Sequence, residues 1–173
     1  MKRISAILQK TFLISLLMQF GCEPKTPSQP AATHAAADPL CSYVSYAPTK
    51  VRIMPLTDFA RRANNQDQPG LRVYVTLLDS FGSQVKTPAT FRFELYQYIE
   101  RSAVPEGRRL AIWPDIDLND AVQNNSFWRD FLRAYEFNLD FDPVPEQTYV
   151  LQVTCMCPLG TRLSTDFKIK YDK

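Results

Sequence analysis

Strict alternation of apolar and polar residues is the feature that most constrains this chain. It recurs in segment after segment, with the period of two that is typical of half-buried β-strands and does not suit an amphipathic helix. The expected strands are Val51 to Leu56, Leu71 to Leu77, Phe91 to Tyr96, Arg109 to Trp113, Tyr135 to Phe141, Tyr149 to Cys155 and Phe167 to Tyr171. The pattern therefore predicts an all-β domain of about seven strands.

Each of these strands presents one apolar face. A single sheet would leave those faces open to water, so a second sheet has to cover them. Turn-forming residues between the strands, such as Asp79-Ser80-Phe81-Gly82, agree with antiparallel neighbours. We therefore expect one antiparallel β-sandwich over residues 40–173, a length that suits a single domain.

One segment changes period. Phe127, Trp128, Phe131, Leu132 and Tyr135 recur at spacings of three and four residues. This predicts a short helical insertion after Ser126, with Ser126 as its N-cap. An aromatic stripe of this kind more often covers the end of a sandwich than binds a ligand.

Two runs resemble known sandwich domains. Residues 73–85, followed by Pro88 and Phe91-Arg92-Phe93, are similar to the early hairpin of bacterial immunoglobulin-like domains. Residues 149–154 are similar to the penultimate strand of fibronectin type III and immunoglobulin-like domains. The resemblance implies an immunoglobulin-like sandwich, although Asp115 to Arg133 is longer than a minimal domain of that kind contains. Such domains serve as spacers, adhesion modules or assembly parts, and the fold alone does not choose among these roles.

The first 21 residues have the pattern of a signal peptide. Lys2, Arg3 and Lys10 precede the apolar run Thr11 to Met18, which is shorter than the roughly 20 residues a membrane-spanning helix needs. Gly21-Cys22 resembles the bacterial lipobox, and this resemblance implies that Cys22 is lipidated and becomes the first mature residue. Gln19 and Phe20 depart from the usual lipobox. An ordinary signal cleaved elsewhere and an uncleaved anchor stay open as alternatives.

Residues 22–39 are rich in Pro and Ala and show no apolar periodicity, which predicts an extended linker. The chain carries 20 Lys and Arg against 18 Asp and Glu. Three of the cations lie in the signal segment, so the mature protein is close to neutral. It lacks the basic field that nucleic-acid binding requires.

Catalytic motifs are scarce. The only histidine, His34, lies in the linker, so histidine-dependent nucleophile systems and histidine metal sites are excluded from the domain. No glycine-rich phosphate-binding motif is present, and we expect no cofactor and no enzymatic activity.

The acidic run Asp115 to Asp120 is the strongest polar candidate. Asp115, Asp117, Asn119 and Asp120 supply the oxygen ligands that Ca²⁺ prefers, although the run does not match an EF-hand loop. With Trp113 or Trp128 as a stacking platform, it would make a carbohydrate-binding module or a carboxylate-based enzyme. The simpler interpretation is a solvated turn in which Asn119 or Asp120 caps a helical turn.

Three cysteines remain once Cys22 is assigned to lipid. In an oxidising compartment a disulfide between Cys41 and either Cys155 or Cys157 is the default expectation, and it leaves one thiol over. A soft-metal site at Cys155-Met156-Cys157 and buried free thiols are the alternatives. Alternation places Met156 on the opposite face from the two cysteines.

Two arginine pairs, Arg61-Arg62 and Arg108-Arg109, are expected in solvated loops, with an acidic surface or a polysaccharide as a possible ligand. Taken together, the sequence favours a non-catalytic lipoprotein of the cell envelope, anchored to the membrane by lipid. Its domain is expected to serve as a binding or assembly module for an envelope protein or a polysaccharide. A secreted or periplasmic protein is the alternative.

Overall fold

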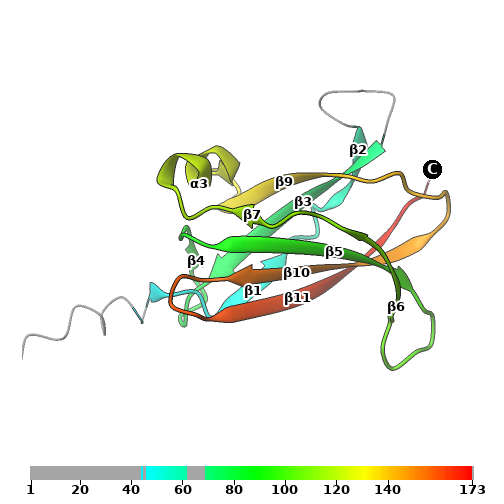
Figure 1. The fold of residues 1–173 in the computed structure, drawn as a ribbon, viewed down its shortest axis with the longest axis horizontal. Helices are drawn as coiled ribbons and strands as arrows, with labels where there is room; N and C mark the ends of the chain where they lie inside the picture. The colour runs from blue at the N-terminus through cyan, green and yellow to red at the C-terminus, as the bar shows by residue number, and fades with distance from the viewer. Residues whose placement is uncertain (1–43, 45, 62–68, 173) are drawn as a thin grey trace, which may run out of the picture. The chain divides into compact units, whose positions relative to one another are not determined.

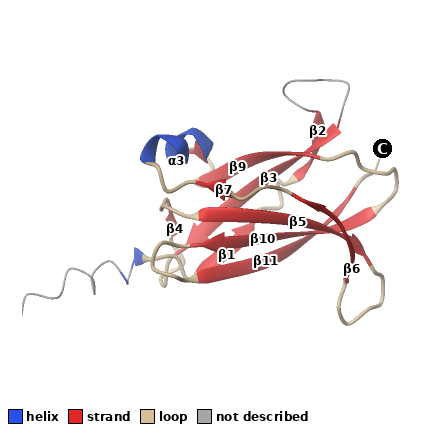
Figure 2. Ribbon diagram, in the orientation of Figure 1, coloured by secondary structure: helices blue, strands red, loops and turns tan. Residues whose placement is uncertain are grey.

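The computed structural model describes residues 44, 46–61 and 69–172. These residues form two antiparallel sheets that pack face to face, with one short helix beside them (Figure 1). Strands account for most of the described chain (Figure 2). The prediction of an all-β, immunoglobulin-like sandwich with a short helical insertion is confirmed.

The first sheet is built around the long strand β3. Its main path runs in the order β1-β3-β9-β8, and the short strands β2 and β4 also pair with β3. The strands of this sheet are β1 (Lys50–Ile53), β2 (Asp58–Arg61), β3 (Pro69–Leu78), β4 (Gln84–Val85), β8 (Trp128–Arg129) and β9 (Ala134–Asp140).

The second sheet is built around β10. It runs in the order β11-β10-β5-β6, and the short strand β7 pairs with β5. Leu151 of β10 lies opposite Leu95 on one side and Phe167 on the other. The strands of this sheet are β5 (Thr90–Tyr98), β6 (Glu106–Ile112), β7 (Ile116–Asp117), β10 (Thr148–Met156) and β11 (Arg162–Lys170).

The seven expected strands correspond to β1, β3, β5, β6, β9, β10 and β11. The first, second and fifth of these strands lie in one sheet and the other four lie in the second. The strands β2, β4, β7 and β8 were not expected, because segments of two to four residues are too short to show a period.

The core lies between the two sheets and is rich in aromatic rings. Phe137 of β9 is fully buried, and its ring centroid lies 4.8 Å from that of Phe93 and 5.0 Å from that of Phe91, both on β5. The apolar faces predicted from alternation are therefore the faces that pack against each other. Their burial supplies most of the free energy that favours folding.

Tyr149 holds the preceding loop in place at the start of β10. Tyr149 is fully buried, and its hydroxyl accepts a hydrogen bond of 2.7 Å from the backbone N–H of Val144, five residues upstream. Burial raises the pKa of this phenol. A tyrosine with this hydrogen bond at the start of a central strand is a recurrent feature of immunoglobulin-like sandwiches.

The helix lies earlier in the chain than the aromatic spacing predicted. It is α3 (Ala121–Phe127), and its N-cap is Asp120, whose carboxylate accepts hydrogen bonds from the N–H groups of Val122 and Gln123. The prediction of a helix after Ser126 was wrong because residues 128–129 form β8 and residues 130–133 form the turn that leads into β9. The capping role suggested for Asp120 is confirmed.

Among the described residues, no helix is both long enough and apolar enough to cross a membrane. The signal segment 1–21, Cys22, the linker 22–39 and Cys41 lie outside the described residues.

Candidate functional site

Four segments come together at one end of the sandwich, which we call the entry end: residues 44 and 46–48, 79–88, 121–133 and 157–161. At this end β3 and β10 finish and β5 and β9 begin (Figure 1). Arg133 donates a hydrogen bond of 3.0 Å to the backbone oxygen of Gln84, which joins the second and third segments. The entry end is therefore a loop cluster assembled from distant parts of the sequence.

The β3–β4 turn at this end has the chemistry expected of it. The carboxylate of Asp79 accepts hydrogen bonds from the backbone N–H groups of Phe81 and Ser83 at 2.9 and 2.8 Å. Gly82 has a φ of 81°, a left-handed conformation that glycine adopts without steric cost. This turn leaves Phe81 at its tip.

A cluster of buried, hydrogen-bonded polar side chains stabilises the entry end. Tyr135 is fully buried, and its hydroxyl bonds to both the N–H and the carbonyl oxygen of Thr87 at 2.9 Å. It also lies 3.1 Å from Oδ1 of Asn124, a buried residue of α3. The amide nitrogen of Asn124 donates to the carbonyl oxygens of Thr87 and Leu118 at 3.0 and 2.9 Å. These bonds hold α3 on the sandwich.

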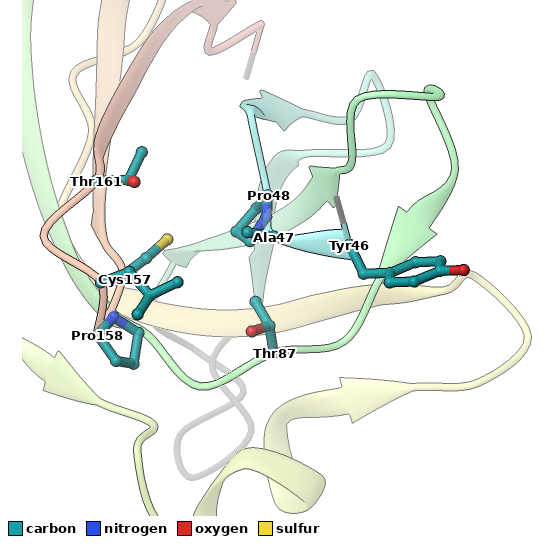
Figure 3. Close-up of a pocket in the computed structure, with 8 residues that line it drawn as sticks. Tyr46, Ala47, Pro48, Thr87, Cys157, Pro158 and Thr161 are labelled. Carbon is teal, nitrogen blue, oxygen red and sulfur yellow. The ribbon is translucent and has the colours of Figure 1, made fainter. Parts of the chain in front are cut away.

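An apolar cavity of about 180 Å³ opens at the entry end (Figure 3). Its wall includes Cys157 and Thr87, and the first described residues of the domain form another part of it. The complete lining is Tyr46, Ala47, Pro48, Thr87, Cys157, Pro158, Leu159 and Thr161. The cavity therefore lies beside the first described residues of the sandwich.

The two described cysteines lie next to this cavity. Cys155 is 0% exposed on β10, Cys157 is 8% exposed just after it, and their sulfur atoms are 4.0 Å apart. Met156 is only half-buried, as alternation predicted for the residue between them. The contact between the two thiols lowers the pKa of Cys157, and the same contact together with burial raises the pKa of Cys155. Both are free thiols in the structure.

Large apolar side chains are exposed at the tips of the entry end. Phe131 is 84% exposed, and Phe81 and Val122 are each 76% exposed. Tyr46 and Leu159, beside the cavity, are exposed as well. Single exposed apolar residues are common, but several on one loop cluster are typical of an interaction surface.

The acidic run is divided among separate partners. Asp115 makes a two-point ion pair with Arg92 of β5, with both nitrogen–oxygen distances at 2.8 Å. Asp117 accepts hydrogen bonds from Asn119, while Asp120 caps α3. Within the described residues, no group of three or more His, Cys, Asp or Glu side chains is placed to hold a metal ion. The four candidate oxygen ligands, Asp115, Asp117, Asn119 and Asp120, are thus engaged locally.

The ion pair between Asp115 and Arg92 leads to a prediction about pH dependence. The hydrogen bond from Arg92 lowers the pKa of the Asp115 carboxyl below its ordinary value. Such a pair stabilises the fold above the unfolded-state pKa, and this contribution disappears as pH falls through the lower, folded-state pKa. Because both groups are exposed, we expect a small effect on stability and a clear effect on titration.

The measurement is an NMR titration of the Asp115 side-chain carboxyl carbon. Its midpoint should move up toward the ordinary aspartate value in Arg92→Gln and stay in place in Arg108→Gln, which removes an exposed arginine from β6. An unchanged midpoint in Arg92→Gln would show that the pair does not form in solution.

Both tryptophans are half-buried and packed against the core. The indole N–H of Trp113 donates to the backbone oxygen of Asp140 at 3.0 Å. Trp128 packs edge-on against Tyr135, and Lys86 lies over its ring, 5.8 Å from the centroid. The rings thus serve packing, and neither is placed with converging carboxylates.

The arginines expected in loops lie elsewhere. Arg61 ends β2, and Arg108 and Arg109 lie inside β6, because the alternating strand begins at Glu106. Arg109 forms an ion pair of 2.8 Å with Glu94 on the neighbouring strand. Arg62 lies outside the described residues. The expectation of loop positions was therefore wrong for Arg61 and Arg108, whereas Arg109 lies in the strand expected from Arg109 to Trp113.

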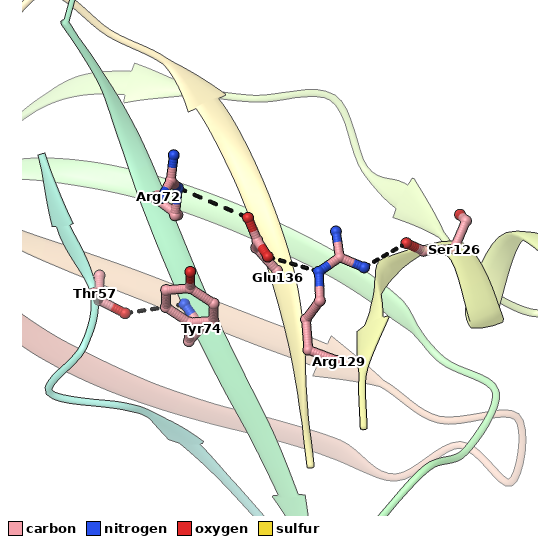
Figure 4. Close-up of polar contacts among 6 residues, drawn as sticks. All are labelled: Thr57, Arg72, Tyr74, Ser126, Arg129 and Glu136. Atoms are coloured by element: carbon pink, nitrogen blue, oxygen red, sulfur yellow. Dashed lines mark hydrogen bonds and ion pairs between the residues drawn. The ribbon is translucent and has the colours of Figure 1, made fainter. Parts of the chain in front are cut away.

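Charged residues on the outer face of the first sheet pair with one another (Figure 4). Glu136 accepts a hydrogen bond of 2.7 Å from Nε of Arg129 and lies 3.7 Å from Nε of Arg72. Arg129 also donates to the backbone oxygen of Ser126 at 2.9 Å. These contacts link β3, β8 and β9. Among the residues described on this face, no reactive side chains converge on one point.

A polar hollow of about 370 Å³ lies at the opposite end of the second sheet. Lys168 lies 3.9 Å from the centre of the Tyr98 ring, and Lys170 pairs with Glu146 at 2.9 Å. The hydrogen bonds to Asp172 and Glu146 raise the pKa of Lys170. Because polar and charged side chains form most of its lining, this hollow offers a partner less apolar surface than the entry end and is the weaker of the two candidate surfaces.

Comparison of the chain with protein-family models, with curated proteins and with solved structures finds no match. The sequence analysis considered Asp115 to Asp120 and the cysteines, and it did not identify the entry end. Its residues come from four separate segments, which no local spacing connects.

Proposed function

We propose that this protein is a cell-envelope lipoprotein, tethered to a membrane through Cys22, whose sandwich is a non-catalytic binding or assembly module. The proposed location in the cell envelope is supported by the charged and apolar segment 1–21, by Gly21-Cys22 and by the linker 22–39. A cysteine-linked anchor followed by an extended spacer lets a domain stand clear of the bilayer.

The observation that carries the binding role is the entry end. It combines an apolar cavity with exposed aromatic and aliphatic side chains, of which Phe81, Val122 and Phe131 are the most exposed. A protein partner gains most from covering such side chains, because their removal from water is favourable by about 25 cal/mol per Å². A polysaccharide would instead require polar groups around an aromatic platform. We therefore favour an envelope protein as the partner.

The non-catalytic role is supported by how the polar groups are used. The sequence of the domain contains no histidine. Asp115 is paired with Arg92, and Glu94 with Arg109. Asp79 and Asp120 hold backbone N–H groups. Carboxylates engaged in this way are poorly suited to act as a general acid and base pair.

The experiment that tests the proposal is intact-mass analysis of the protein extracted from membranes of its own host. We expect a mature species that begins at Cys22 and carries added acyl mass. The mass should be absent in Cys22→Ala and retained in Cys41→Ala, the matched control. A soluble, unacylated species would contradict the anchor.

The same host strain tests the binding role. A photocrosslinking residue at position 131 should give one discrete protein adduct that Val122→Asp weakens, because both positions lie on the entry end. The same residue at position 138, on the outer face of β9, is the control. Equal adducts at 131 and 138, or none at 131, would contradict the entry end as the binding surface.

A further inference from the structure

We propose that the cavity at the entry end receives one ring-sized apolar side chain from an acidic segment of the partner protein. Exposed cations around the cavity pair with the carboxylates that flank this side chain. The inference rests on the proposed function, because that function supplies a protein partner at the entry end. It goes further by stating which chemistry the bound segment of the partner must have.

The volume of the cavity fits one ring. At about 180 Å³ it is slightly larger than an apolar cavity of about 150 Å³ that takes up benzene in another protein. The side chain of phenylalanine ends in the same ring. Because the cavity opens at the surface, such a side chain can enter it while the sandwich stays folded (Figure 3).

The wall of the cavity offers few free hydrogen-bonding groups. Pro48 and Pro158 have no N–H group. The N–H and the carbonyl oxygen of Thr87 are both bonded to the hydroxyl of Tyr135. The carbonyl oxygen of Thr161 accepts a backbone hydrogen bond of 2.9 Å. A sugar would lose hydrogen bonds to water here without replacing them, whereas an apolar side chain gains free energy by leaving water.

The residues around the cavity carry a local surplus of positive charge. Lys50, Lys86 and Arg162 each lie within two residues of a lining residue, and no aspartate or glutamate does. All three cations are exposed. The whole chain carries 20 Lys and Arg against 18 Asp and Glu, so this surplus belongs to the surroundings of the cavity and not to the chain in general. It complements a negatively charged segment.

These cations are free to pair with a partner. None of the three forms an ion pair with another described residue. Lys86 donates a hydrogen bond of 2.6 Å to Oδ1 of Asn125, a neutral group, and lies over the ring of Trp128. Arg92 and Arg109, by contrast, already hold carboxylates of the chain itself. A partner carboxylate can therefore add an ion pair at the cavity without breaking one.

The surface beside the cavity favours a protein segment over a small ligand. Tyr46 and Leu159 line the cavity and are exposed, and Phe81 and Phe131 are exposed on other loops of the entry end. A small apolar molecule would fill the cavity and leave these side chains in water. A protein partner covers them together with the cations. One buried anchor surrounded by weaker contacts is the usual energetic pattern of such an interface.

The experiment uses the full mature chain, residues 22–173, with Cys22→Ala, which keeps it free of lipid and of detergent that could occupy the cavity. The probes are short peptides with blocked ends: phenylalanine flanked by glutamates, phenylalanine flanked by lysines, and alanine flanked by glutamates. NMR follows the methyl signals of Ala47, Leu159 and Thr161, which line the cavity.

We expect the peptide with phenylalanine and glutamates to shift these methyl signals with a dissociation constant about tenfold lower than that of either other peptide. Only this peptide supplies both the ring and the negative charges. Equal affinity of the glutamate and lysine peptides would overturn the proposal. Equal affinity of the phenylalanine and alanine peptides, or no shift at these methyl groups, would overturn it as well.

Variants locate the effect on the molecule. Lys86→Glu combined with Arg162→Glu should raise the dissociation constant of the phenylalanine and glutamate peptide about tenfold. Arg101→Glu combined with Arg108→Glu makes the same charge change at exposed positions beyond the far end of β5 and on β6, and should leave it unchanged. Ala47→Leu adds methyl groups at the cavity wall and should weaken binding. The comparison of peptides decides the matter even if a variant fails to fold.

Two further probes test other classes of ligand. Tetragalacturonate, an acidic oligosaccharide, and vesicles of phosphatidylglycerol, an anionic lipid, should both leave the three methyl signals in place. A response to tetragalacturonate equal to the response to the phenylalanine and glutamate peptide would overturn the apolar anchor. Loss of the signals on addition of vesicles would overturn the choice of a protein segment.

The inference and the proposed function fail in different ways. In the host, a photocrosslinking residue at position 159 should join the same protein as one at position 131, through a peptide rich in aspartate and glutamate. A joined peptide without acidic residues, or an adduct at 131 with no peptide response at the cavity, would overturn this inference alone. Peptide binding at the cavity with no adduct at 131 would contradict the proposed function and leave the chemistry of the cavity standing.

Discussion

Replacing Phe137 with alanine is expected to lower the free energy of unfolding by about 3–5 kcal/mol, the typical cost of truncating a fully buried phenylalanine. Phe137 is 0% exposed and lies at the centre of the aromatic core. Its ring meets Phe91 and Phe93 on β5 and Phe127 at the end of α3, with centroids 4.8 to 5.4 Å apart. Alanine would leave a cavity that rings from both sheets and the helix border.

Urea unfolding followed by the fluorescence of Trp113 and Trp128 measures this loss. The control is Asn138→Ala, which truncates the next residue of β9 on the exposed face and is expected to change stability little. A loss below about 1 kcal/mol in Phe137→Ala would mean that the two sheets do not pack through this ring.

The second large effect is expected at Asn124. Its side chain donates to the carbonyl oxygens of Thr87 and Leu118 and lies 3.1 Å from the hydroxyl of Tyr135. Alanine leaves these buried groups short of partners, and each such group costs about 1–3 kcal/mol. Because Tyr135 keeps its bonds to Thr87, we expect a total loss of about 2–3 kcal/mol.

The same urea experiment measures the loss, and Gln123→Ala is the matched control because it removes an exposed side chain from the same helix. A double variant with Tyr135→Phe should lose less than the sum of the two single variants, because both remove the same contact. Strict additivity would show that Asn124 and Tyr135 do not interact.

The long strands were predictable because each has one apolar face that packs in the core and one polar face that is turned toward water. In β5, Phe91, Phe93 and Leu95 are buried while Arg92 and Glu94 are not, as the alternation required. β3 is less regular, since Tyr74 and Thr76 on its second face are buried too. β3 has paired strands on both sides. Its burial therefore reflects its position in the sheet rather than the pattern of its own residues.

The helix shows the limit of local spacing. Phe127, Trp128 and Phe131 have helical spacing, yet Phe127 ends α3, Trp128 begins β8 and Phe131 lies exposed in the turn that follows. Pairing with β9 across a short turn gave Trp128 and Arg129 a partner strand, and this hairpin pairing outweighed the helical periodicity. Asp120 could be recognised as a cap because capping is a local hydrogen-bonding preference.

The candidate site was visible only in part from the sequence. Spacing placed Cys155 and Cys157 on the same side of one strand and Met156 on the other, and the structure agrees. Spacing could not show that Cys157 lines a cavity or that residues 46–48 form its opposite wall.

The sequence by itself determined seven of the strands, the two-sheet architecture and the turn at Asp79 to Gly82, because period and turn chemistry are properties of neighbouring residues. The tertiary structure alone decided where α3 lies and how the entry end is assembled from four distant segments. It also decided that Asp115 faces Arg92 rather than its acidic neighbours. Contacts between residues far apart in the chain determine these features, and no local pattern encodes them.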